Sequence, residues 1–180
     1  MYIMSLLLEN DAPRDYGCLM AFPPVHVMPH FIKFAKTAVL PHTIYTEEGD
    51  SSYGYADEPH VTVKYGFTPD LTKRDLAKVL KGIVPFMLSF SKLSLFENDK
   101  FDVVKFDVEP HKILTEIRKR CDDHPNEDKY PDFHPHSTVA YVKKGMFPHI
   151  KDGVNIKLPI TRFKYSSSTA GGDKKLFINI

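Results

Sequence analysis

Apolar residues recur at helical spacing in three segments of the chain, which predicts three amphipathic helices. The first helix begins at Pro29, presents a face that includes Phe31 and Ala35, and ends before Pro41. The other two are expected over 71–82 and from 110 to 120. Asp70 or Thr72 would cap the second of them, with Gly82 at its end, and the third carries basic residues in its later turns.

Other segments alternate apolar and polar residues, which is typical of strands with one solvated face. Within residues 17–28, a strand is predicted that enters a turn at Pro23-Pro24. Further strands are predicted over 60–65, 86–96, 101–108, 136–141, 154–165 and 174–180. The third and fourth would form a hairpin about Asn98-Asp99, and a loop over 166–172 would join the last two. The polar segment 46–58 is expected to be a mobile, solvated loop whose glycines could allow it to close over a bound nucleotide, and 122–135 a second polar loop.

The two halves of the chain follow the same order of elements. In each, a helix leads to a polar loop ending in Pro-His, and a short strand then begins with His-x-Thr-Val. The repeat distance is a little under half the chain, which favours a duplicated fold. We therefore expect an α+β fold with two antiparallel sheets lining a cleft and helices outside. Residues 1–180 would form one domain with two pseudo-symmetric lobes.

The repeated motifs are the strongest indication of chemistry in the sequence. On a strand, residues i and i+2 share a face, so His60 lies beside Thr62, and His136 beside Thr138. Two such pairs facing one cleft would place two imidazoles and two hydroxyls around one small anion. One imidazole could accept a proton from a nucleophile while the other protonates a leaving oxygen, which suits phosphoryl transfer without a metal ion or other cofactor.

Composition narrows the range of partners. The 24 Lys and Arg nearly balance the 23 Asp and Glu, for a net charge of +1, which argues against binding duplex nucleic acid or a membrane surface by bulk attraction. Two widely separated Cys predict no disulfide, residues 1–10 do not fit a signal peptide, and no segment is long enough to span a bilayer. We expect a cytoplasmic protein, and no obligate protein partner is evident.

With these motifs the chain resembles the two-histidine (2H) phosphoesterase superfamily, whose LigT-like fold also has one motif in each of two lobes. Three stretches, 58–66, 101–108 and 132–142, are most similar to the phage anti-CBASS proteins. The resemblance implies metal-independent cleavage of 3′–5′ linkages in cyclic di- and trinucleotides, such as cGAMP, that serve a bacterial immune system. It also implies that His60, Thr62, His136 and Thr138 are catalytic, without saying which histidine is the acid and which the base.

Three further residues are candidates for substrate binding. The resemblance suggests that Tyr16 contacts substrate and that Phe96 stacks on a base. Lys64 shares the strand face of His60 and Thr62 by simple alternation and could offset phosphate charge. Each also has an ordinary structural interpretation: a surface tyrosine, a core phenylalanine and a solvated lysine at a strand end.

Alternatives remain open at this point. The first alternative is a metal-dependent protein with a zinc site formed by His134, His136 and a loop carboxylate. Processing of RNA ends, by opening a 2′,3′-cyclic phosphate or trimming an oligonucleotide, would keep the chemistry and change the substrate. A binding module that sequesters a cyclic nucleotide would need neither imidazole for catalysis.

Overall fold

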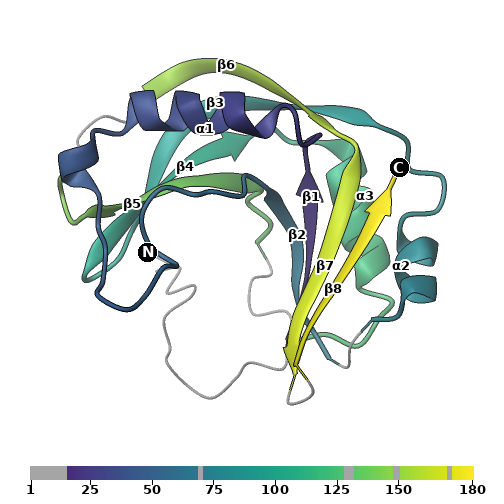
Figure 1. Cartoon of the computed structure of the whole chain (residues 1–180). Helices are drawn as coiled ribbons and strands as arrows, with labels where there is room; N and C mark the ends of the chain where they lie inside the picture. The colour runs from purple at the N-terminus through teal and green to yellow at the C-terminus, as the bar shows by residue number, and fades with distance from the viewer. Residues whose placement is uncertain (1–15, 69–70, 128–131, 148–150, 170–171) are drawn as a thin grey trace.

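Two curved antiparallel sheets form a half-barrel, with helices on its outer side (Figure 1). The computed structural model describes residues 16–68, 71–127, 132–147, 151–169 and 172–180. Sheet A contains, in spatial order, β2 (Val61–Phe67), β1 (Gly17–Phe22), β7 (Arg162–Thr169) and β8 (Gly172–Asn179). Sheet B contains β5 (His136–Lys143), β4 (Phe101–Val108), β3 (Phe86–Glu97) and β6 (Lys151–Ile160). The predicted fold class is confirmed.

The three predicted helices are present as α1 (Met28–Ala38), α2 (Lys73–Val79) and α3 (Lys112–Cys121), and a single 3-10 turn, η1 (Pro41–Thr43), follows α1. Thr72 caps α2: its hydroxyl accepts from the Asp75 amide while the Asp75 carboxylate accepts from the Thr72 amide. Asp70, the other candidate, lies outside the described residues. None of the helices formed by the described residues is long and apolar enough to cross a membrane.

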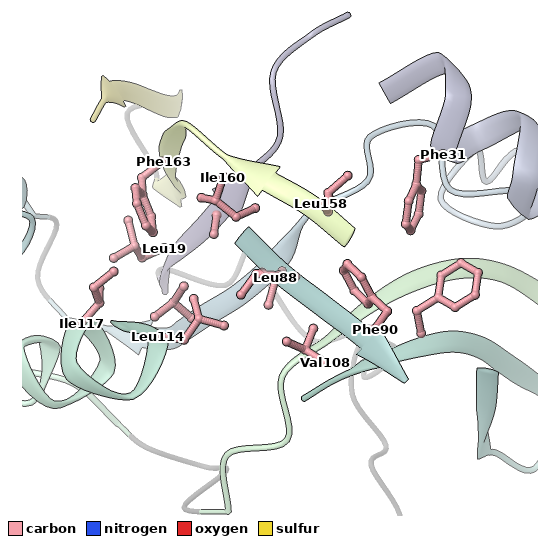
Figure 2. Packing of buried hydrophobic residues seen from close by; sticks show 14 of the residues in the cluster. Leu19, Phe31, Leu88, Phe90, Val108, Leu114, Ile117, Leu158, Ile160 and Phe163 are labelled. Carbon is pink, nitrogen blue, oxygen red and sulfur yellow. The ribbon is translucent and has the colours of Figure 1, made fainter. Parts of the chain in front are cut away.

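One hydrophobic core joins the outer faces of both sheets. Leu19 and Phe163 of sheet A, Leu88 and Leu158 of sheet B, and Leu114 of α3 belong to the same buried cluster (Figure 2). The ring of Phe31 on α1 packs against those of Phe90 and Phe106, at centroid distances of 6.0 and 5.3 Å. Because the apolar side chains turn outward toward the helices, the polar side chains of the strands are left on the inner face of the half-barrel.

The C-terminal region differs from the prediction. The strand expected over 154–165 is divided at Thr161, so that β6 pairs with β3 in sheet B and β7 pairs with β1 in sheet A. The loop expected over 166–172 is largely strand, since Ser166 and Ser167 pair with Cys18 and Gly17. Hydrogen bonding to β1 outweighs the turn preference of this serine-rich stretch.

The segment 46–58 is not a free lid. Its two ends are held on the edge of sheet B, because the Tyr45 amide donates to the Tyr141 carbonyl and the Ala56 amide to the Val139 carbonyl. Tyr53 is buried and makes edge-on contacts with the rings of Phe101 and Tyr141. The prediction of a mobile loop overlooked these aromatic contacts, which fix its middle against the sheet.

Candidate active site

Both motif histidines are held by the same backbone contact. Nδ1 of His60 lies 2.7 Å from the carbonyl oxygen of Glu58, and Nδ1 of His136 lies 2.8 Å from that of His134. A carbonyl oxygen only accepts hydrogen bonds, so each Nδ1 carries a proton and donates it. In the neutral imidazole this leaves Nε2 as the basic nitrogen of each ring. The residue two positions before each histidine therefore selects its tautomer.

The two motif strands lie next to each other although they belong to different sheets. β2 contacts β5 across the sheet boundary. A positive charge on His60 lowers the pKa of His136, as expected for rings carried by adjoining strands. The structure therefore brings together the two halves of the predicted site.

Each motif is followed at once by a β-bulge. In β2, Thr62 pairs with Met20 and Lys64 pairs with Leu19, so Val63 is the extra residue. In β5, Thr138 pairs with Lys105 and Ala140 pairs with Val104, so Val139 is the extra residue of that strand.

The bulge overturns the prediction for Lys64. The extra residue turns Lys64 to the outer face, where it is 1% exposed and its Nζ lies 2.8 Å from Asp122 at the end of α3. Simple alternation placed Lys64 beside Thr62, but the bulge removes that alternation. Its charge is used in an ion pair on the helix side of the sheet.

His60 stands on the inner face of sheet A beside an aromatic ring and an ion pair. Its ring stacks on that of Phe22, with centroids 5.4 Å apart and planes at 28°. Nζ of Lys164 lies 5.4 Å from the Phe22 centroid and 2.5 Å from a Glu58 carboxylate oxygen. Glu58 thus fixes His60 through its carbonyl and Lys164 through its side chain.

His136 has a perpendicular aromatic ring and a buried lysine as neighbours. Its ring meets that of Phe96 at 87°, with centroids 4.9 Å apart. Nζ of Lys105 lies 4.3 Å from the Phe96 centroid and donates to the Ser94 hydroxyl at 2.7 Å. Lys105 also forms an ion pair with Asp107. Phe96 therefore lies beside the catalytic candidate, as its proposed role in stacking requires.

A pocket of about 350 Å³ opens next to His136. Its lining combines strand ends of sheet B, the first turn of α3 and the segment before β5, and includes Phe96, Lys105, Asp107, His111, Phe133 and His134. Two phenylalanines with charged and hydrogen-bonding groups are a composition that suits a planar polar ligand.

Burial lowers the pKa of both motif histidines. Desolvation is the main cause for each, and it brings the pKa of His136 to about 4. The cations Lys164 and Lys105 lower the pKa of His60 and His136 respectively, while Glu58 and Asp107 act in the opposite direction. Both imidazoles are therefore neutral at pH 7 in the absence of a bound anion, and both Nε2 atoms can accept a proton.

Tyr16 lies at the far end of β2 from His60. Its hydroxyl donates to a Glu127 carboxylate oxygen at 2.5 Å, and its ring meets that of Tyr65 edge-on at 5.9 Å. Tyr65 is five residues beyond His60, which is about 16 Å along a strand. The structure thus places Tyr16 on a neighbouring part of the protein and not beside the histidine pair.

A glycine determines where Glu127 lies. Gly66 has φ of +100°, and a Cβ at this position would be 2.2 Å from the Glu127 carbonyl oxygen. The Glu127 amide donates to the Gly66 carbonyl at 2.8 Å. A side chain at position 66 would push away the segment that carries the partner of Tyr16.

Neither cysteine has the properties of a nucleophile. Burial raises the pKa of both Cys18 and Cys121 to about 12, so both thiols are protonated at neutral pH. Among the described residues, no group of three or more His, Cys, Asp or Glu is arranged to hold a metal ion.

Three neighbours of the histidines were not predicted from the sequence: Phe22, Lys105 and Lys164. Each comes from a strand other than the one that carries the motif, so the contact depends on cross-strand register. A signal was present for Lys105, since a lysine directly between the apolar residues Val104 and Phe106 is unusual in a strand. Phe22 and Lys164 gave no comparable signal.

The family model described as the 2′-5′ RNA ligase superfamily matches residues 29–150 of the chain. The chain belongs to this superfamily, the 2H phosphoesterases. Both motifs fall within the matched region, and membership of the superfamily implies phosphodiesterase-type activity. No curated protein matches the sequence.

Solved structures extend the likeness to nearly the whole chain. Escherichia coli LigT complexed with 3′-AMP has a TM-score of 0.59 at 13% identity, and the match covers 94% of this chain and 96% of LigT. Kluyveromyces marxianus Usb1 has a TM-score of 0.58 at 9% identity, with 93% and 99% covered. A Thermus thermophilus protein has a TM-score of 0.56 at 16% identity, with 91% and 95% covered. These similarities show that the superfamily's fold is shared.

Proposed function

We propose that the protein is a metal-independent phosphodiesterase that cleaves the 3′–5′ linkages of cyclic di- and trinucleotides. One observation carries this proposal: two imidazoles at the starts of adjoining strands, β2 and β5, have the same tautomer. Each has a threonine two residues later on its strand, Thr62 or Thr138, whose hydroxyl can donate to a non-bridging phosphate oxygen.

The reaction needs one proton acceptor and one proton donor. One imidazole Nε2 takes the proton of a ribose 2′-hydroxyl, and O2′ attacks the adjacent phosphorus. The bond from phosphorus to O5′ breaks, and the other imidazole, as imidazolium, protonates O5′. The product is a 2′,3′-cyclic phosphate. Water then adds to that phosphorus with the proton roles reversed, the bond to O2′ opens, and a 3′-phosphate remains.

The lowered pKa values make substrate binding part of this chemistry. In the free protein both rings are neutral at pH 7, so one of them must gain a proton before it can act as the acid. A phosphate anion between the rings favours the charged imidazolium and raises its pKa. We expect proton uptake to accompany binding.

The small number of phosphates in a cyclic oligonucleotide suits this site. The chain has a net charge of +1, and the lysines beside the histidines are each paired with a carboxylate. A long polyanion requires many unpaired cations along its path. The pocket beside His136 can take a base against Phe96. With the anti-CBASS resemblance, this favours a phage protein that acts in the bacterial cytoplasm against cyclic-nucleotide immunity.

A second candidate is opening of a 2′,3′-cyclic phosphate at an RNA end. It is favoured by the family model, which is that of the 2′-5′ RNA ligase superfamily, and by the fold shared with LigT. It uses the second half of the reaction above and needs the same residues. The two candidates differ in substrate and in whether the first step, attack by O2′, takes place.

The test is incubation of the purified protein with cyclic GMP-AMP in EDTA, beside an RNA that ends in a 2′,3′-cyclic phosphate. We expect a linear 3′-phosphorylated product from the cyclic dinucleotide. Opening of the RNA end alone would select the second candidate. Recovery of intact cyclic GMP-AMP after denaturation, from a protein that bound it, would overturn the enzyme and indicate a sequestering module. His60→Ala and His136→Ala should bind without cleaving.

A further inference from the structure

One line of residues crosses the inner face of sheet A, starting at the catalytic candidate Thr62. Thr62 pairs with Met20, Met20 with Lys164, and Lys164 with Phe177 on the edge strand β8. Three strand spacings separate the ends of this line, which places Phe177 about 14 Å from Thr62. The line leads from the reaction centre to the outer edge of the sheet.

Phe177 exposes 51% of its surface on this face. Its neighbours along β8 on the same face, Lys175 and Asn179, are also exposed, whereas the alternate residues Leu176 and Ile178 pack against the core. An aromatic ring lying on a polar sheet face is a surface on which a base can stack.

Arg162 on β7 lies between two phenylalanine rings. Its Cζ is 5.4 Å from the Phe22 centroid and 5.9 Å from that of Phe177. Within the described residues its guanidinium has one polar contact, a long one of 3.9 Å to the sulfur of Met28, and no carboxylate within ion-pair distance. Its Nε is buried without an acceptor there. A guanidinium has five donors in a planar fork that matches a phosphate, so this one has donors left for an anion.

The phenylalanine Phe22 joins this arginine to the reaction centre. The same ring stacks on His60 and contacts the Lys164 ammonium. His60 and Arg162 therefore contact the same ring. Lys164 is paired with Glu58, which leaves Arg162 as the better anion ligand of the two.

We infer that Arg162 binds a second, non-reacting phosphate of the substrate and that Phe177 stacks on the base next to it. This inference rests on the proposed function and narrows its substrate class to molecules with at least two phosphates and a base beyond the scissile linkage. A cyclic dinucleotide meets this requirement. A mononucleoside 2′,3′-cyclic phosphate meets only the part at His60 and His136.

The experiment compares kcat/KM for cyclic GMP-AMP with kcat/KM for 2′,3′-cyclic AMP. Arg162→Gln and Phe177→Ala should each lower the value for the dinucleotide about tenfold more than that for the mononucleotide. Phe177→Trp should restore the dinucleotide value, because a larger ring stacks at least as well. The control Arg74→Gln removes an exposed arginine on α2 and should leave kcat/KM unchanged for both substrates.

Salt provides a readout that a purely structural arginine would not move. KM for the dinucleotide should rise with ionic strength in the wild type, and the slope should be shallower in Arg162→Gln. Equal losses of kcat/KM for the two substrates, or an unchanged dependence of KM on ionic strength in Arg162→Gln, would overturn the inference. Arg162 would then be a structural contact between two rings.

Failure of the proposed function is distinguishable from failure of this inference. If the wild type cleaves no cyclic dinucleotide, the proposed function is wrong, and calorimetric binding of cyclic GMP-AMP still tests the second phosphate site. Binding weakened about tenfold by Arg162→Gln supports the site, whereas binding equal to that of the wild type, or no binding by either protein, contradicts it.

Discussion

The surroundings of the two histidines agree in the backbone and differ in the side chains. Both rings donate from Nδ1 to the carbonyl two residues earlier, and in both strands the valine after the threonine forms a bulge. His60, however, lies flat on the fully buried Phe22, whereas the rings of His136 and Phe96 are perpendicular. The lysine near His60 comes from the third strand of its sheet, and the one near His136 comes from the adjacent strand.

In the proposed mechanism, this difference would let a repeated motif perform two different tasks. The shared backbone contacts give the two rings the same tautomer, which both proton donor and proton acceptor require. The unshared side chains give each ring its own electrostatic environment, so that one can lose a proton while the other keeps it. The repeated motif accounts for the likeness, and the neighbouring strands would account for the division of roles that the proposed mechanism requires.

Removal of either ring is the strongest test of the comparison. His60→Ala and His136→Ala should each lower kcat about 10²–10⁴-fold, because each removes one proton-transfer group. The measurement is turnover of cyclic GMP-AMP with unfolding curves for every variant. His30→Ala, at an exposed position of α1, is the matched control and should retain full activity. A kcat within a few-fold of wild type for one variant would mean that its ring takes no part in proton transfer.

The pH dependence should reflect the buried position of both rings. Catalysis needs one ring neutral and the other protonated, and the pKa of each lies below the ordinary 6.5. The optimum of kcat/KM, which reports the free protein, should therefore lie below pH 6.5, with activity falling as the pH rises and the acid loses its proton. An optimum above pH 7 would show that burial does not control these groups.

The ion pair of Lys64 and Asp122 provides a test of whether Lys64, turned outward by the bulge, contributes to stability and not to catalysis. Asp122→Ala leaves the buried Lys64 ammonium without this carboxylate and should lower the free energy of unfolding by about 1–3 kcal/mol. Because Lys64 faces away from the motif, kcat should be unchanged. Asp123→Ala, at the exposed position next to it, is the control for denaturant unfolding. A lower kcat with an unchanged free energy of unfolding would contradict this placement and show that Lys64 acts on the inner face, beside the motif.

Replacement of each of the two lysines, Lys105 and Lys164, by an apolar residue should show which histidine is the acid and which is the base. Lys105→Met removes a cation that lowers the pKa of His136, and Lys164→Met removes one that lowers the pKa of His60. Each variant should move one limb of the kcat/KM profile to higher pH, and the limb that moves identifies the role of the histidine. Movement of the same limb by both variants would show that the environments are not separate. Leu at the same positions repeats the test with a different apolar side chain.

Much of this arrangement follows from local sequence pattern. The helices, the hairpin of β3 and β4 and the paired motifs were predicted because periodicity, capping residues and turn residues act over a few positions. The orientation of Lys64 was not predictable, since a bulge at Val63 leaves no mark in the alternation of β2. Lys105, Lys164 and Phe22 depend on register between strands that are distant in the sequence.

The division of the chain at Thr161 has a consequence for how the protein assembles during synthesis. All four strands of sheet B lie within residues 86–160, whereas sheet A combines the first two strands of the protein with the last two. The surroundings of His136 can form from one continuous stretch, while those of His60 wait for β7 to reach β1 across most of the chain. On the ribosome, the site of His136 would therefore be ready first, and the enzyme would acquire activity only after its last strands had emerged.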